Sequence, residues 1–510
     1  MRGSRGVRRL AQQVLGGAPR VHVGMRATDA GLDESVVRGA IELALRIGEA
    51  MLSLGAPAAD VTGAINRVIR AFGLPRCQVE VNFTTITLSY DRGGAAYPIT
   101  LMRIAPSRIA DYGRLGSVME LAQEIGEQRT SLDEAPARLE RDHGRLDEIV
   151  QAPHSYRRWV VTLVLSVLAG AVAVLLGGGA GVALVAGATT AVIDRVVLAL
   201  ERWGLPAFFL QMVGAGIASS VAVGLHLVIP VLPVELEALP PSLVVASGIV
   251  VLLAGLSLVG SAEDAISGFP QTAGARAFEV VVLTLGIVVG IGAVLDIARR
   301  AGVDLPVINV EGRSVPVVVV VTAGAVIAGA WAVASYARPR AAAAAAVAGA
   351  VASIVFSVAR DLGAGPAVAS AAAALLIGFL AEYAGPRLRV PPLVISVCGI
   401  VPLLPGLAIY RGLYDLVNEP TGGLGPGAAG LLGAAMVGLG LAGGVTLGEY
   451  LAAPLRRRHH RQRSLKALRR RSPWVPRPRG QRLQDEVRGQ GGQATSRAGG
   501  HQTDPEPPGG

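Results

Sequence analysis

The chain has few charged residues for its 510 residues, and this scarcity excludes an ordinary soluble protein. Charged residues make up 16% of the sequence, whereas a soluble globular domain carries about 25%. Apolar residues reach 51%, and the mean hydropathy is +0.50. The composition therefore predicts a membrane protein.

Cysteines and aromatic residues are also scarce. Cys77 and Cys398 are the two cysteines, and their wide separation excludes a disulfide framework, so we expect two free thiols. Aromatic residues make up 4% of a chain with a net charge of +10. A folded nucleic-acid site would need aromatic or groove-reading elements beside its positive charge. We therefore expect no nucleic-acid partner and assign the arginine clusters to the membrane surface.

Motifs for catalysis, metal binding or nucleotide binding are missing as well. The sequence contains no Gly-x-Ser-x-Gly, no His-Glu-x-x-His and no phosphate-binding loop. We predict no enzyme activity, no cofactor and no metal. Without an ATP site, a transporter would have to be secondary. Residues 1–30 have no apolar core after their basic start, so we also expect no signal peptide.

The N-terminal part predicts a small α+β domain. Apolar residues recur at helical spacing over 33–54, and Gly55 is a stop signal; a second helix follows from Pro57 to Phe72. Alternation then predicts strands over 77–83, 85–90 and 95–104, with a turn at 91–94. Two further helices are expected at 107–127 and 131–150.

From Trp159 onward the sequence predicts membrane spans. About 20 apolar residues in a helix cross the ~30 Å hydrocarbon layer, and ten segments fit. They cover residues 159–176, 180–200, 205–229, 242–260, 276–298, 315–336, 341–359, 363–384, 392–410 and 424–453.

Arginine placement predicts the orientation of these spans. With the N-terminus inside, the inside loops contain most of the arginines, as the positive-inside rule requires. Arg299 and Arg300 oppose the rule, but the Arg-rich tail outweighs them. Both termini are therefore predicted to be cytoplasmic, in a multi-pass protein of the inner (plasma) membrane.

A weak internal duplication indicates the architecture. Residues 248–256 (GIVVLLAGL) match 399–407 (GIVPLLPGL), and Asp264 corresponds to Asp415 at the same spacing. Segment four thus corresponds to segment nine, and the repeat unit has five helices. Because five is odd, the two units enter the membrane from opposite faces, as in many secondary transporters.

These residues resemble the threonine/serine exporter family over about 33–455, with both membrane halves in one chain. The soluble part matches at 44–48, 55–56, 61–62, 84–86, 116–118 and 131–135, and the membrane part at 255–256 and 405–407. The resemblance implies ten helices with a cytoplasmic N-terminal domain, and export of threonine and serine driven by the proton motive force. Some split relatives are associated with dicarboxylate export instead.

Duplicated positions supply the candidate site, a cavity between segments four and nine. A proline followed by glycine breaks a helix and frees backbone groups for a ligand. Pro405 and Gly406 match this pattern, whereas Ala254 stands before Gly255. A helix break is therefore less expected at Gly255 than at Gly406. Charges inside a membrane are costly and often functional. The predicted substrate-binding residues are Gly255, Asp264, Gly406, Asp415, Gln211 and Ser219, and the proton-coupling candidates are Asp264, Asp415 and Glu263. His226 is a weaker candidate for a proton relay. The alternative for the acidic residues is solvation at helix ends, and for the glycines close helix packing.

The sequence therefore predicts a secondary exporter of small amino acids, with protons, amino acids and the lipid bilayer as partners; a homo-oligomer stays open. A dicarboxylate exporter, a channel, or a membrane protein with a hydrolytic or regulatory soluble domain are the alternatives. The predicted divisions are a disordered basic N-terminus (1–30), the soluble domain (31–156), two membrane repeats (157–300 and 301–455) and a disordered Arg/Pro/Gly-rich tail (456–510).

Overall fold

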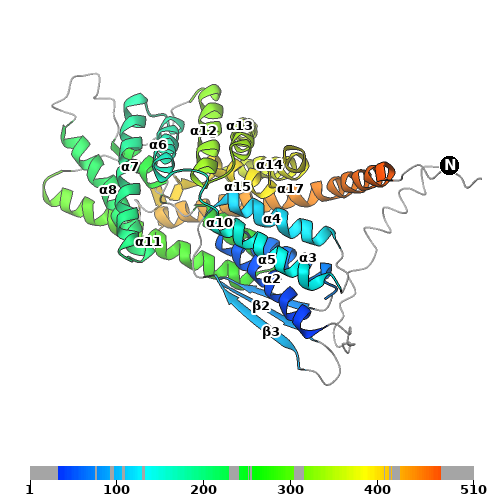
Figure 1. The fold of residues 1–510 in the computed structure, drawn as a ribbon. Helices are drawn as coiled ribbons and strands as arrows, with labels where there is room; N and C mark the ends of the chain where they lie inside the picture. Colours follow the sequence, from blue (N-terminus) through cyan, green and yellow to red (C-terminus); the bar gives the residue numbers. More distant parts are fainter. Residues whose placement is uncertain are drawn as a thin grey trace, which may run out of the picture. The chain divides into compact units, whose positions relative to one another are not determined.

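A computed structural model gives the arrangement of most of the chain (Figure 1). It describes residues 33–74, 77–91, 97–105, 110–128, 133–228, 241–250, 252, 255–303, 315–406, 408–409, 411–412, 415 and 425–471. The compact unit discussed below ends at Pro454. The predicted turn at 92–94, the predicted disordered N-terminus (1–30) and residues 472–510 of the predicted disordered tail (456–510) lie outside the described residues. Residues 456–471 of that tail are helical, as the end of α17(Gly425–Arg471).

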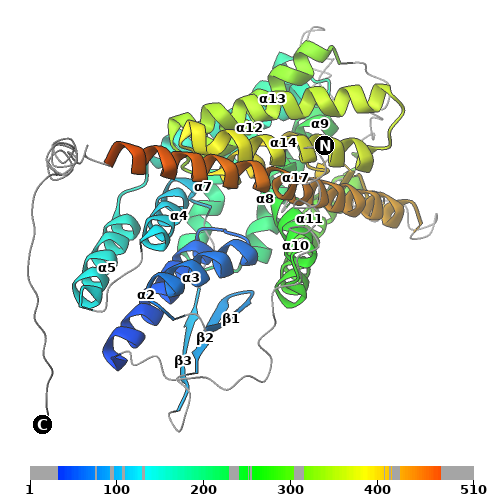
Figure 2. The ribbon, with the colours of Figure 1, turned by 90° about the vertical axis from the view of Figure 1, so that its right-hand side faces the viewer.

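In its described residues, the N-terminal part combines four helices with a three-stranded sheet. The elements are α2(Glu34–Ser53), α3(Ala58–Ala71), β1(Cys77–Asn82), β2(Thr85–Tyr90), β3(Ile99–Ile104), α4(Tyr112–Glu127) and α5(Ala135–Gln151). The strands are antiparallel in the order β1-β2-β3. Helices α2 and α3 cover one face of the sheet (Figure 2). Alternate β2 residues Ile86, Leu88 and Tyr90 are buried, because successive side chains of a strand point to opposite faces.

Turn chemistry explains where the first helices begin and end. Asp33 caps α2 by accepting a hydrogen bond from the Ser35 backbone N–H at 3.2 Å, which satisfies an otherwise unpaired amide of the first turn. Gly55 and Gly73 follow α2 and α3 with φ of +92° and +78°, a conformation that glycine adopts without steric cost. Short connections therefore keep α2 and α3 antiparallel against the sheet.

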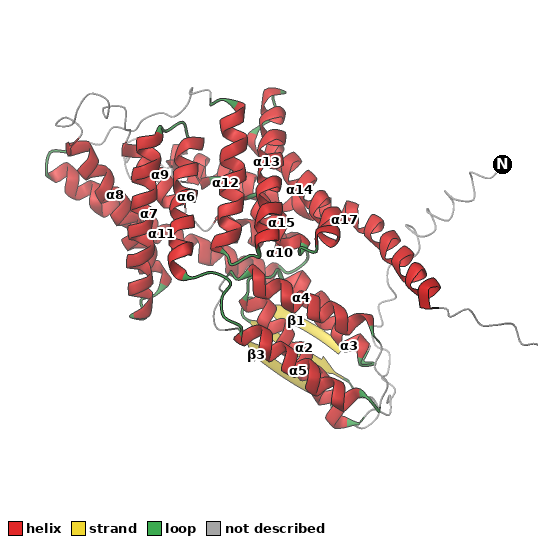
Figure 3. Ribbon diagram, turned by 45° about the horizontal axis from the view of Figure 1, so that its top comes forward, coloured by secondary structure: helices red, strands yellow, loops and turns green. Residues whose placement is uncertain are grey.

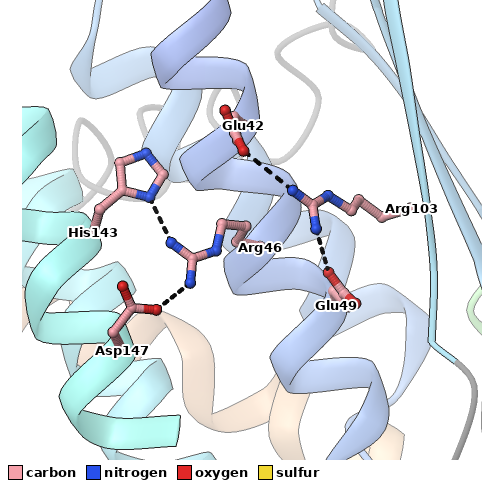
Figure 4. Close-up of polar contacts among 6 residues, drawn as sticks. All are labelled: Glu42, Arg46, Glu49, Arg103, His143 and Asp147. Atoms are coloured by element: carbon pink, nitrogen blue, oxygen red, sulfur yellow. Dashed lines mark hydrogen bonds and ion pairs between the residues drawn. The ribbon is translucent and has the colours of Figure 1, made fainter.

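Two arginine-centred contacts connect α2 with its neighbours (Figure 4). Arg46 on α2 donates to His143 Nδ1 at 2.9 Å and pairs with Asp147, both on α5. Arg103 on β3 pairs with Glu42 and Glu49 on α2. Burial, together with the Arg46 charge, lowers the pKa of His143. Since these ion pairs are partly exposed, we expect them to fix the orientation of α2, α5 and β3 but to contribute little to the stability of the fold.

Among the residues that the structure describes, eight helices are long and apolar enough to cross a membrane. They are α6(Arg158–Leu175), α7(Ala180–Arg202), α8(Ala207–Val228), α11(Pro270–Arg300), α12(Val317–Ala334), α13(Pro339–Asp361), α14(Pro366–Leu388) and the Gly427–Pro454 part of α17(Gly425–Arg471). Figure 3 shows these long helices in a bundle beside the α/β part. The chain is thus a polytopic helical membrane protein.

The two remaining predicted spans, segments four and nine, are broken into shorter pieces. Segment four forms α9(Pro241–Val250) and α10(Gly255–Ile266), with Leu252 in a turn between them. Segment nine forms α15(Pro392–Gly399) and the 3-10 helix η3(Val401–Leu403). Leu404 is extended, because a residue before proline is disfavoured in the helical region. The two segments that the duplication relates are therefore not continuous helices: the break in segment nine agrees with the one predicted before Gly406, whereas the break in segment four was less expected.

Glycines allow the membrane helices to approach one another closely. A Cβ atom at Gly290 of α11 would lie 2.2 Å from the Met212 carbonyl oxygen of α8. A Cβ atom at Gly444 or Gly448 of α17 would lie 2.4 Å or 2.2 Å from a carbonyl oxygen of α14. Only a residue without a side chain fits at such distances, which is the usual form of close packing between membrane helices.

Candidate functional site

A cavity of about 450 Å³ lies between the broken segments, the neighbouring long helices and the N-terminal domain. This volume is in the range of small-molecule sites. Both broken segments contribute to its wall, α10 with 256–263 and the α15–η3 region with 393–406. Helices α6, α11, α12 and α17 complete the membrane side of the wall.

The cavity wall combines apolar surface with charges of both signs and three hydroxyl groups. The lining side chains that carry a charge, a hydroxyl or an indole are Tyr112, Ser257, Glu263, Arg276, Glu279, Trp331 and Ser396. A mostly apolar wall with a few converging polar groups is the usual composition of a ligand site. This set can bind a small zwitterion, because it offers carboxylates to an ammonium group and a guanidinium to a carboxylate.

Backbone groups add to this set because the helices are broken here. Leu256 and Ser257, which line the cavity, lie in the first turn of α10. The first backbone N–H groups of a helix have no partner inside the helix and attract anions. Gly406, also in the wall, follows the extended residue Leu404. Broken helices whose ends face a cavity are a recurring feature of transporter sites.

A buried ion pair lies at the end of α10. Asp264 Oδ2 is 2.8 Å from Arg276 Nη1, and their side chains are 0% and 8% exposed. Asp264 Oδ1 also accepts a hydrogen bond of 3.0 Å from the backbone N–H of Ala58. Since Ala58 is the first residue of α3, the carboxylate is stabilised by the positive end of that helix dipole.

Two further residues connect the N-terminal domain to this region. Arg276 Nη2 donates to the Ala56 carbonyl oxygen at 3.4 Å. The Thr272 hydroxyl donates to the Val81 carbonyl and accepts from the Phe83 N–H, each at 3.1 Å. The start of α11 therefore binds both the α2–α3 connection and the end of β1.

The structure places the predicted site residues in three groups. Glu263 and Gly406 line the cavity, and Gly255 begins the helix whose next two residues line it. Asp264 lies beside the cavity in the ion pair with Arg276. The remaining predicted residues, Asp415, Gln211 and Ser219, are not among the lining residues, nor is His226. Their roles stay predictions.

Sequence reasoning missed several polar residues of this site. Arg276 stands at the first position of the segment predicted over 276–298, whereas α11 begins at Pro270, so Arg276 lies within the helix. Ser257 and Ser396 stand in apolar runs, where serines are common. The Ser396 hydroxyl lies 3.4 Å from the carboxylate of Glu449 on α17, a contact that no local pattern indicates. The available signal for Glu449 was its position inside the apolar segment predicted over 424–453.

A bundle of membrane-length helices, with two broken segments around a charged cavity, defines this chain as a multi-pass membrane transporter rather than an enzyme. Comparison with known proteins agrees with that class. Residues 42–298 match the family described as "Putative threonine/serine exporter", and residues 320–451 match "Threonine/Serine exporter, ThrE". The chain belongs to the threonine/serine exporter family, so the family resemblance noted in the sequence is confirmed.

Two relatives cover most of the chain. A "Probable threonine/serine exporter" of Mycobacterium tuberculosis is 38% identical over 438 residues, which is 84% of this chain and 79% of that protein. A "Threonine/serine exporter" of Corynebacterium glutamicum is 36% identical over 433 residues, 83% of this chain and 85% of that protein. No solved structure matches the chain.

Proposed function

We propose that this protein exports threonine and serine by secondary transport coupled to inward proton movement, and that the amino acid binds in the cavity between the broken segments. The observation that carries this proposal is that the two segments related by the duplication are both broken, and that both line one cavity with charges of both signs. The family membership supports the substrate class.

The polar groups of the wall suit a zwitterion with a short hydroxylated side chain. Arg276 and the first turn of α10 are the proposed partners of the carboxylate, and Glu263 is the proposed partner of the ammonium group. Arg276 lines the cavity, and its Nε is a buried donor with no hydrogen-bond partner among the described residues. Ser257 and Ser396 are the proposed partners of the substrate hydroxyl.

The charge balance favours this substrate over a dicarboxylate. Glu263 and Glu279 line the cavity with Arg276, and Arg276 already pairs with Asp264. A dicarboxylate would bring two more negative charges to a wall with an excess of carboxylates, and like charges repel strongly where water is excluded. A zwitterion adds no net charge.

For proton coupling we propose Glu263 in preference to Asp264. Both carboxylates lie near the cavity, but Asp264 binds the Arg276 guanidinium and the Ala58 amide. Protonating Asp264 would remove the charge that both partners need. Glu263 lines the cavity and does not take part in the contact among Asp264, Arg276 and Ala58. Asp415 stays a candidate on the strength of the duplication alone.

We further propose two inverted five-helix repeats, on the support of equivalent helix contacts. In segments one and two, a Cβ at Gly187 of α7 would lie 3.0 Å from the Ser166 carbonyl oxygen of α6. In segments six and seven, a Cβ at Gly349 of α13 would lie 2.5 Å from the Gly324 carbonyl oxygen of α12. The α8–α11 contact at Gly290 similarly corresponds to the α14–α17 contact at Gly444.

The contacts of the N-terminal domain also support the proposed topology. Tyr112 donates its N–H to the Ser335 carbonyl oxygen at 2.9 Å, and Arg338 donates to the Ser117 hydroxyl at 3.0 Å. Together with Asp264, these partners lie after segments four and six, on the side predicted to be inside. We therefore propose that the domain and both termini are cytoplasmic, in the inner membrane.

The direct test is threonine efflux. Cells that contain this protein and cells that lack it are loaded with a threonine dipeptide. Threonine in the medium is then measured before and after addition of a protonophore. The expected result is protein-dependent efflux that falls to background when the proton gradient collapses. Efflux that is indifferent to the gradient would indicate a channel, and the absence of protein-dependent efflux would refute export of threonine.

A further inference from the structure

The N-terminal domain forms part of the cavity wall. Gly55 and Pro57, from the α2–α3 connection, and Ala110 and Tyr112, at the start of α4, line the same cavity as the membrane helices. Both segments are also tied by hydrogen bonds to the membrane part, at Asp264 and Ser335. A ligand in this cavity would therefore lie against the domain, which closes one side of it.

The contact that holds this wall in place contains the same arginine that faces the cavity. Arg276 lines the cavity, pairs with Asp264 and donates to the Ala56 carbonyl oxygen. Asp264 in turn accepts from the Ala58 amide. We refer to Asp264, Arg276 and the backbone of Ala56 and Ala58 as the latch.

We propose that the N-terminal domain is the gate on this side of the cavity, and that a substrate carboxylate opens it by competing with Asp264 for Arg276. This inference rests on the proposed function. In the structure, the Arg276 guanidinium and the start of α3 share the carboxylate of Asp264, and we take this arrangement as the closed state. A substrate carboxylate on Arg276 would weaken that pair and so weaken the attachment of α3.

The physical basis is a difference in affinity between two states. A ligand shifts a conformational equilibrium only if it binds one state better than the other. Here the open state has an Arg276 released from Asp264, and it binds a carboxylate better than the closed state does. Asp264 is therefore a positioning residue that acts through Arg276 and α3, not a group that touches the substrate.

A buried cysteine on the domain side of the latch reports opening. Ala58 is 0% exposed. Ala58→Cys keeps the backbone N–H that donates a hydrogen bond to the Asp264 carboxylate. Ala44, also 0% exposed, lies in the core of the domain on α2, so Ala44→Cys reports unfolding of the domain instead. Both cysteines are placed in the full chain with Cys77→Ser and Cys398→Ala.

The experiment measures maleimide labelling of both reporters in proteoliposomes, with threonine or with threoninol, in which CH₂OH replaces the carboxylate. Threonine binding is measured in parallel by equilibrium dialysis. We expect threonine to raise the labelling rate of Ala58→Cys by at least about fivefold, the lower end of typical coupling between sites. Threoninol should have no such effect, and neither ligand should change Ala44→Cys. Asp264→Asn should label fast at Ala58→Cys without threonine.

Each other outcome overturns a specific claim. If threonine binds but leaves the labelling of Ala58→Cys unchanged, the gate is refuted while the proposed function stands. If threonine does not bind at all, the proposed function fails with it. If threoninol accelerates labelling as threonine does, the carboxylate is not the trigger. If Asp264→Asn exposes Ala44→Cys as well, that variant has unfolded, and the threonine response of the chain with Asp264 intact decides the question.

Discussion

Replacing Arg276 by methionine is expected to destabilise the protein strongly and to bring threonine export to background. Removing one partner of a buried ion pair leaves an uncompensated charge and costs about 3–5 kcal/mol. Asp264, at 0% exposure, would be that charge. The measurement combines thermal unfolding of the purified protein with threonine efflux at matched protein levels in the membrane.

The double variant Arg276→Met/Asp264→Asn separates stability from transport. Because it removes both charges, we expect most of the lost stability to return, while export stays at background since the partner of the substrate carboxylate is missing. Arg276→Lys, which keeps the charge but not the forked donor geometry, should retain weak export with a raised KM. Export by the double variant at the wild-type rate would show that Arg276 has a structural role alone.

The second substitution with a large expected effect on stability lies where α14 and α17 pack together. Gly448→Ala is expected to destabilise the protein by about 1–3 kcal/mol, the usual cost of adding a methyl group to a packed contact. The new Cβ would lie 2.2 Å from the Leu375 carbonyl oxygen of α14, and backbone atoms cannot move aside as a flexible side chain can. The helices would have to separate. Thermal unfolding in detergent measures the change.

Gly433→Ala is the matched control on the same helix. Gly433 is exposed, and apart from its own stretch of helix no atom lies within 4 Å of its Cβ position. Alanine should be neutral or slightly stabilising there, because it has the higher helix propensity. Equal effects of the two substitutions would mean that α14 and α17 do not approach as described.

Much of the fold follows from local signals in the sequence. The eight long apolar helices agree with predicted segments to within a few residues, apart from longer ends of α11 and α17, since continuous apolar runs allow little else. Pro405 likewise predicts the break in segment nine. The sequence signal for a break is weaker in segment four, because residues 242–260 contain no proline.

The site was less predictable because it depends on long-range contacts. The duplication directs attention to segments four and nine, and Glu263 and Gly406 line the cavity between them. However, Asp264 was interpreted as facing a substrate, whereas it pairs with Arg276 and caps a helix 206 residues away in the sequence. Neither periodicity nor spacing carries information about such a pairing. The contribution of the N-terminal domain to the wall had no sequence signal at all.

The most direct test of the central claim asks whether threonine occupies the cavity. In a background with Cys77→Ser and Cys398→Ala, Ser257→Cys reports the cavity wall, and Ser219→Cys on α8 is a control outside it. At ten times its Kd, threonine should slow maleimide labelling of Ser257→Cys by about tenfold, because few sites are then free, and should leave Ser219→Cys unchanged. Unchanged labelling of Ser257→Cys in a variant that still exports threonine would contradict the account, and protection of Ser219→Cys instead would place the site on α8.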